Sequence, residues 1–147
     1  MTEPPAPKKR PKPTHTWRTH PTWKEKTRSE RWLRERGWTV DNVEYRLPGS
    51  FITKDLFGFG DLMAIRATLP HLIVQATSAT NSAARETKIE KEPRAALWLR
   101  TGGAIHVHGW ARPSPGGRRS EWALRIVCAV LNDLDGIEWR VIEEVDR

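Results

Sequence analysis

The chain has 147 residues, a single cysteine and a formal net charge of +7. This length fits one domain with its own core, and one cysteine excludes both an internal disulfide framework and a CxxC metal site. No apolar run approaches the roughly 20 residues of a bilayer-spanning helix, and no apolar signal segment follows the first methionine. We therefore expect a soluble protein without membrane association, in the cytoplasm, or in the host cytoplasm if a phage encodes it.

Most of the positive charge lies in the first 28 residues. This segment holds eight cationic and two acidic side chains and six of the eleven prolines. It has too few apolar side chains to offset the entropy of ordering, so we expect residues 1–28 to form a disordered basic arm and residues 29–147 to form the domain. Cations interleaved with tryptophan suit DNA, because cations hold phosphates while rings stack on bases; a solubilising tail is the alternative. The expected DNA contacts in the arm are Lys8, Lys9, Arg10, Lys12, Trp17 and Arg18.

The first half of the domain predicts one helix and three strands. Ser29 fits a helix N-cap, and Gly37 fits the stop after its last turn. Alternating apolar and polar residues predict a half-buried strand over 43–47. Two short apolar runs, 62–65 and 72–77, predict a hairpin of buried strands.

The next segment predicts a helix pair and a strand. Residues 83–92 are rich in helix formers, and Pro93 cannot sit inside a helix, so it begins a second one. Two glycines at 102–103 end that second helix, and residues 105–110 alternate as a strand.

The end of the chain predicts a loop and further strands. Residues 113–120 form a basic loop, in which Arg118 and Arg119 are expected to hold the DNA backbone. Residues 121–131 alternate like a strand at first, but a helix stays open for the later part. Residues 137–145 read as a final strand, and the whole order predicts an α/β fold with a mixed sheet of four or five strands flanked by helices.

One polar pair stands out in the predicted hairpin. Asp61 lies where a glycine turn enters the strand 62–65, and Gln75 lies near the end of the strand 72–77. The spacing brings the two to the same end of the sheet, and Gln75 and Thr77 share a face because strand periodicity is two. An Asp at a strand start is often only a turn residue, but a buried amide needs partners, so the pair indicates a functional site.

This pattern resembles the PD-(D/E)XK nuclease superfamily, and within it the small Holliday-junction-resolvase-like proteins of phages and archaea. The resemblance covers roughly residues 29–110. The segment Gly60-Asp61-Leu62-Met63-Ala64-Ile65 is similar to the metal-binding Asp strand. The segment 72–78 is similar to the (D/E)xK strand, except that Gln75 replaces the acid and Thr77 replaces the lysine. The family implies a restriction-endonuclease-like fold: a helix carrying an acid, a strand, the Asp strand, the (D/E)xK strand, a helix and another strand.

The resemblance also implies a chemistry. It implies a homodimer that cuts branched or structured DNA with Mg²⁺ or Mn²⁺, since paired carboxylates hold hard cations that activate water. Lys88, on the helix after the strand, would replace the missing lysine, with Lys54 as second choice. Glu30 on the first helix would add a carboxylate. The expected metal ligands are Asp61, Asp55 and Gln75, and the expected catalytic residues are Asp61, Gln75, Lys88 and Glu30.

Two other functions stay open. The missing acid and lysine favour a catalytically inactive relative that keeps the fold and binds nucleic acid. A phage structural or interaction protein, whose tail binds an acidic partner, is the third possibility. His106 and His108 alternate on one strand face and can bind Zn²⁺ or phosphate, but no third ligand is placed nearby, so a polar strand face is the stronger interpretation.

Overall fold

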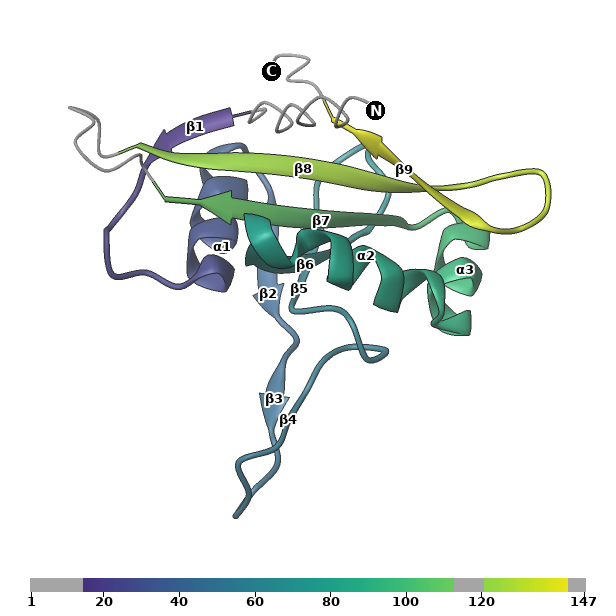
Figure 1. Ribbon diagram of the computed structural model, residues 1–147, viewed down its shortest axis with the longest axis horizontal. Helices are drawn as coiled ribbons and strands as arrows, with labels where there is room; N and C mark the ends of the chain where they lie inside the picture. The colour runs from purple at the N-terminus through teal and green to yellow at the C-terminus, as the bar shows by residue number, and fades with distance from the viewer. Residues whose placement is uncertain (1–14, 113–120, 143–147) are drawn as a thin grey trace, which may run out of the picture.

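The computed structural model describes residues 15–112 and 121–142. A large curled sheet forms the middle layer of the α/β fold, and helices flank both of its faces (Figure 1). No helix in the described ranges is long and apolar enough to cross a bilayer. The predicted DNA contacts that lie outside these ranges are Lys8, Lys9, Arg10, Lys12, Arg118 and Arg119.

The elements follow one another as a strand, a helix, five strands, a pair of helices and three strands. The helices are α1 (Glu25–Glu35), α2 (Ser82–Glu90) and α3 (Pro93–Arg100), and a 3₁₀ turn, η1 (Ala79–Asn81), precedes α2. The strands are β1 (His15–Arg18), β2 (Thr39–Asn42), β3 (Tyr45–Arg46), β4 (Thr53–Lys54), β5 (Leu62–Ile65), β6 (Leu72–Ser78), β7 (Ala104–Ala111), β8 (Glu121–Leu131) and β9 (Ile137–Val141).

The main sheet has seven strands, in the order β1-β8-β7-β6-β5-β2, with β9 also paired to β8. The pairs β2–β5 and β5–β6 are antiparallel, which confirms the predicted hairpin, whereas β6 and β7 are parallel. A parallel pair needs a crossover connection, and α2 with α3 supplies it. The sheet is therefore mixed, as predicted, but larger than the four or five strands expected.

Alternating side chains of β6 build two cores. Leu72 and Val74 belong to a buried cluster with Trp32 of α1, whereas Ile73 faces the opposite cluster with Ile89 of α2. Successive strand residues point to opposite faces, so this central strand is apolar on both sides and carries helices on both.

The domain begins earlier than predicted. β1 pairs antiparallel with the start of β8, and α1 begins at Glu25. Ser29, predicted as the N-cap, is a fully buried residue inside the helix. The boundary at residue 28 is therefore wrong, because residues 15–28 belong to the folded domain.

Long-range contacts explain this earlier start. Trp17, predicted as a DNA-stacking residue of a free arm, instead packs against Trp110 at a ring distance of 6.0 Å, and its indole N–H donates to Glu35 (2.9 Å). Arg18, by contrast, keeps an exposed side chain whose guanidinium lies 4.0 Å from Glu121. Trp110 and Glu121 both lie far from β1 in the sequence, so local composition could not reveal this strand.

Other local predictions hold in part. The helix pair is confirmed, with Pro93 at the first position of α3. Residues 121–131, left open between strand and helix, are strand throughout, since the first part of β8 pairs with β1 and the later part with β9. The strand predicted over 43–47 shrinks to β3, because residues 45–46 leave the main sheet and pair with β4 alone.

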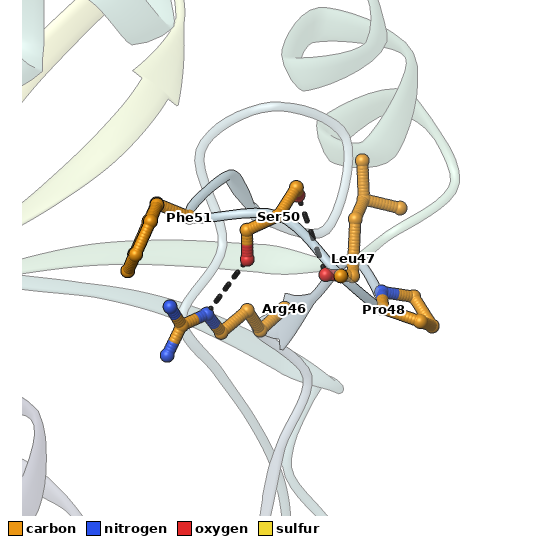
Figure 2. Close-up of a pocket in the computed structure, with 6 residues that line it drawn as sticks. Arg46, Leu47, Pro48, Ser50 and Phe51 are labelled. Carbon is orange, nitrogen blue, oxygen red and sulfur yellow. Dashed lines mark hydrogen bonds between the residues drawn. The ribbon is translucent and has the colours of Figure 1, made fainter.

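The β3–β4 hairpin projects away from the main sheet (Figure 1). At its tip, the Arg46 Nε donates to the Ser50 carbonyl (2.9 Å) and the Ser50 hydroxyl donates to the Leu47 carbonyl (3.3 Å), as Figure 2 shows. Phe51 beside them is 94% exposed. Glu44 precedes β3 and Asp55 follows β4, so the base of the hairpin brings two acids to the sheet.

Candidate metal centre

Three carboxylates meet at the base of the hairpin. Oxygens of Glu44, Asp55 and Asp61 all lie within 4.8 Å of one another, with Asp61 buried and the other two half-buried. We call this set the carboxylate cluster. Carboxylate oxygens are the preferred ligands of hard divalent cations, so the cluster can hold a metal ion.

A closed loop brings Asp55 beside Asp61. Leu56 and Gly60 exchange both backbone hydrogen bonds (2.9 and 2.8 Å), which folds residues 55–60 back on themselves. Gly60 is required here, because a Cβ on it would lie 2.7 Å from the Ile73 side chain. The glycine-rich segment is thus a tight turn that places two acids together.

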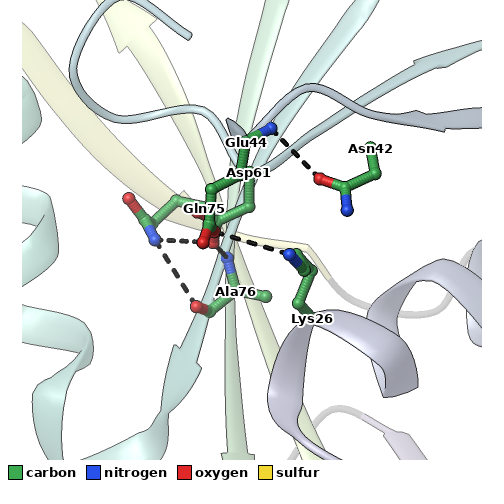
Figure 3. A network of polar contacts seen from close by, with 6 residues as sticks. All are labelled: Lys26, Asn42, Glu44, Asp61, Gln75 and Ala76. Carbon is green, nitrogen blue, oxygen red and sulfur yellow. Dashed lines mark hydrogen bonds and ion pairs between the residues drawn. The ribbon is translucent and has the colours of Figure 1, made fainter. Parts of the chain in front are cut away.

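Glu44 reaches the cluster through an extension of the sheet ladder. The Val43 N–H donates to the Asp61 carbonyl (3.1 Å), which fixes the next residue beside Asp61. The Glu44 N–H donates to the Asn42 side chain (3.1 Å), and its carboxylate lies 3.7 Å from the Lys26 ammonium of α1 (Figure 3).

Asp61 is held by two donors from β6. Its Oδ2 accepts from the Gln75 side-chain amide (2.8 Å) and from the Ala76 backbone N–H (2.9 Å) (Figure 3). The other amide atom, Gln75 Oε1, is buried without a hydrogen-bond partner in the described part of the chain, and it points away from Asp61. Gln75 therefore acts here as a donor that positions Asp61, and the geometry does not present it as the predicted metal ligand.

Burial and mutual repulsion perturb the carboxylate cluster, even with the Lys26 ammonium 3.7 Å from Glu44. Burial above all, together with the neighbouring Asp55 and Glu44, raises the pKa of Asp61 to about 7, while the hydrogen bond from Ala76 opposes this rise. Burial and Glu44 likewise raise the pKa of Asp55. A bound cation would relieve this repulsion and favour the ionised carboxylates.

Helix α2 presents cations to the same place. The charges of Lys88 and Arg85 both lower the pKa of Asp55, which puts them within electrostatic reach of the cluster. Lys88, predicted to serve the site, is exposed on α2 and free to approach a substrate. Lys54, the second choice, lies exposed on β4.

Glu30 is not part of the carboxylate cluster. Its carboxylate instead accepts from the Arg34 guanidinium one helical turn away (2.9 Å), so the predicted catalytic role has no support in this geometry. The third acid is Glu44, which the sequence analysis missed. In the sequence, Glu44 looks like an outward-facing polar residue of an alternating strand. Its position just before the β3–β4 hairpin is the feature that brings it to the site.

The predicted histidine pair is structural. His108 is fully buried, and its Nδ1 lies 2.8 Å from the Ser29 hydroxyl, which also accepts from the Trp110 indole N–H (2.9 Å). Burial lowers the pKa of His106 to about 4 and lowers that of His108 well below its usual value, so both rings are neutral at physiological pH. His108 is therefore a buried structural residue and not part of the polar strand face that the sequence predicts.

Comparisons with known proteins add no guide to function. No protein-family model, no curated protein and no solved structure matches this chain.

Proposed function

We propose that the protein is a divalent-metal-dependent nuclease that hydrolyses phosphodiesters in branched or otherwise structured DNA. The observation that carries this proposal is the carboxylate cluster, in which three acids from separate segments meet within 4.8 Å beside the cations of α2. Like charges gathered in a partly buried place cost stability, and a bound cation is the simplest compensation.

The order of the elements supports the same proposal. Along the chain, α1, β2, β5, β6, α2 and β7 follow the order that the nuclease resemblance implies, with Asp61 at the entry to β5 and Gln75 on the neighbouring β6. The β3–β4 hairpin is then an insertion between two of the implied strands. We include the restriction-endonuclease-like fold in the proposal on this basis.

In this mechanism the chain's own groups have separate tasks. Glu44, Asp55 and Asp61 would hold Mg²⁺ or Mn²⁺, which supplies Lewis acidity at the scissile phosphate and an activated water. Gln75 and the Ala76 N–H keep Asp61 in place. Lys88 and Arg85 would contact phosphate oxygens and stabilise the charge that develops on them.

Cleavage of model DNA tests the proposal. Purified protein is incubated with four-way, flap and linear DNA in Mg²⁺ or Mn²⁺, alongside Asp61→Asn and the matched surface control Asp133→Asn. We expect metal-dependent cutting of branched DNA by the wild type and by Asp133→Asn, and none by Asp61→Asn. No cut product with either metal, or equal cutting by Asp61→Asn, would overturn it.

A catalytically inactive DNA-binding protein is the second candidate. Gln75 and the buried Thr77 stand where the family has an acid and a lysine, which favours it. Binding of the same DNAs without cutting in either metal, with a steep loss of affinity as salt rises, would identify this function. The homodimer that the resemblance implies stays a prediction, and sedimentation of the free protein tests it.

A further inference from the structure

A second site lies beside the start of α1, apart from the carboxylate cluster. It is a cavity of about 430 Å³ at the end of the sheet where β6 and β7 finish. Three cations and three aromatic rings line it: Lys24, Arg28, Arg112, Trp23, Trp110 and Trp122. We call it the Trp/Arg pocket; the only carboxylate among its described lining residues is that of Glu25.

Arg28 is the unusual residue of this pocket. Its side chain is only 2% exposed, and its guanidinium lies 3.3 Å above the Trp122 ring. Nη2 donates to the Pro21 carbonyl (3.1 Å) and to the His20 carbonyl (3.4 Å), but Nε has no hydrogen-bond partner among the described residues.

No carboxylate forms an ion pair with Arg28 in the described part of the chain. The nearby Glu25 offsets part of this charge, but a buried cation with a spare donor stays costly unless an anion contacts it directly. Arg112 and Lys24 add positive charge at the same cavity, so the missing partner is an anionic group.

The rings make the pocket suitable for a nucleobase as well. Trp110 and Trp122 are almost fully buried and form its inner wall, whereas Trp23 is half-buried and stacks on His20 at a ring distance of 5.6 Å. The Arg31 guanidinium lies 5.7 Å from the Trp23 ring centroid, and the exposed His20 ring occupies a place on Trp23 that a base can take. A ring next to guanidinium groups is the combination that binds one base and its phosphate.

The pocket also lies close to the carboxylate cluster. Ser78, which lines it, follows Gln75 by three residues on β6, a separation of about 10 Å along a strand. Lys26 lies between the pocket residues Glu25 and Arg28 on α1, and its ammonium lies 3.7 Å from the Glu44 carboxylate of the cluster. Neighbouring nucleotides of one DNA strand can therefore reach both places.

We propose that the Trp/Arg pocket binds an unpaired nucleotide of the DNA strand next to the scissile phosphate. Its phosphate contacts Arg28 and Arg112, and its base stacks against Trp23. A base inside a duplex has both faces covered by its neighbours, so only an unpaired or extruded base fits, and branched DNA supplies one at low cost. The placement of this nucleotide next to the scissile phosphate rests on the proposed nuclease function. The binding of the nucleotide in the pocket does not.

Binding without cleavage tests the pocket separately. A short single-stranded oligonucleotide with 2-aminopurine at one position is titrated with the wild type in EDTA, and both fluorescence anisotropy and 2-aminopurine quenching are followed. We expect the base to be quenched on binding. Trp23→Ala should abolish the quenching and weaken binding at least about five-fold, the lower range for a stacked base, and Arg112→Ala should weaken it to a similar extent.

Matched variants and probes keep the test decisive. Trp139→Ala and Arg140→Ala change the same residue types far along the chain on β9 and should bind like the wild type. A fully abasic oligonucleotide of the same length should bind the wild type and Trp23→Ala equally. Wild-type quenching and affinity in both Trp23→Ala and Arg112→Ala would overturn the pocket.

The two proposals fail in different ways. If the pocket variants bind normally while Asp61→Asn alone stops cutting, the pocket inference is wrong and the nuclease proposal stands. If the pocket variants lose binding but no metal supports cutting, the pocket stands and the protein is a binding protein. Thermal unfolding of each variant confirms that it is folded before either conclusion is drawn.

Discussion

Two buried polar clusters of this chain are built in opposite ways. The carboxylate cluster gathers groups of one charge, whereas Ser29, His108 and Trp110 form a neutral set in which one hydroxyl serves two rings at 2.8 and 2.9 Å. We call the second set the serine–histidine cluster. It lies under α1, and the His108 ring also meets Trp32 edge to face at 5.7 Å.

The difference teaches which buried polar residues indicate function. The serine–histidine cluster joins α1 to β7 with two neutral hydrogen bonds, which stabilise a fold, although the buried His108 Nε2 has no hydrogen-bond partner among the described residues. The carboxylate cluster repels itself, and burial raises the pKa of Asp61 to about 7. Carboxylates that repel one another are costly to keep together, so they mark a site where a ligand is expected.

The largest expected effect is on activity. Asp61→Asn should lower metal-dependent DNA cleavage at least about 100-fold, because it removes the central ligand of the proposed metal. The same change should leave the free energy of unfolding in EDTA equal or higher, since it removes a repelled carboxylate. Initial cleavage rates and urea unfolding measure the two effects. If Asp61→Asn is less stable than the wild type but cleaves DNA at the same rate, Asp61 stabilises the fold and is not a metal ligand.

The two clusters should also respond to pH with opposite sign. Folded Asp61 keeps its proton up to about pH 7 and the unfolded chain loses it near pH 4, so this carboxyl makes stability fall as pH rises between those values, by up to roughly 4 kcal/mol. The lowered pKa of buried His108 makes stability rise toward pH 6.5 instead, because only the unfolded chain binds the proton.

Urea unfolding in EDTA across this pH range separates the two contributions. Asp61→Asn should keep the rise that His106 and His108 produce and should lose the fall that Asp61 produces between about pH 4 and pH 7. Identical pH profiles for the wild type and Asp61→Asn would contradict the raised pKa of Asp61.

Ser29→Ala should cost about 2 kcal/mol of unfolding free energy. It leaves the buried His108 Nδ1 and the Trp110 indole N–H without their partner, and each unmet group carries a desolvation penalty. Urea denaturation at neutral pH measures the loss. Ser82→Ala, a buried helix serine with one weak side-chain contact (3.4 Å), is the control and should lose less.

Gln75→Glu should produce the smallest change in stability. The change should be a loss without metal and a gain when Mg²⁺ is bound. A fourth carboxylate beside Asp61 should lower stability in EDTA and tighten Mg²⁺ binding roughly ten-fold, because affinity for hard cations rises with ligand charge. Thermal unfolding with and without Mg²⁺ shows both effects. If Gln75→Glu is more stable than the wild type in EDTA, the carboxylates of the cluster do not repel one another.

Features that depend on neighbouring residues could be predicted from the sequence. The apolar runs of β5 and β6, the proline that begins α3 and the aspartate at the glycine turn are all recognisable within a few residues. Asp55 and Asp61 were paired for the same reason, since one short loop joins them.

Contacts between distant segments could not be predicted. β1 forms because Trp17 finds Trp110 and because residues beyond 120 provide a partner strand. Glu44 joins the carboxylate cluster only because the sheet ladder continues past β2 and β5. Glu30, on the other hand, forms an ion pair with Arg34 one turn away on its own helix.

Binding of Mn²⁺ to the free protein tests most directly whether the carboxylate cluster is a metal site. Electron paramagnetic resonance counts the free ion as wild type, Asp61→Asn and Asp133→Asn are titrated without DNA. We predict that the wild type and Asp133→Asn bind Mn²⁺ with the same affinity, and that Asp61→Asn loses this binding. Equal Mn²⁺ binding by Asp61→Asn and the wild type would contradict the account.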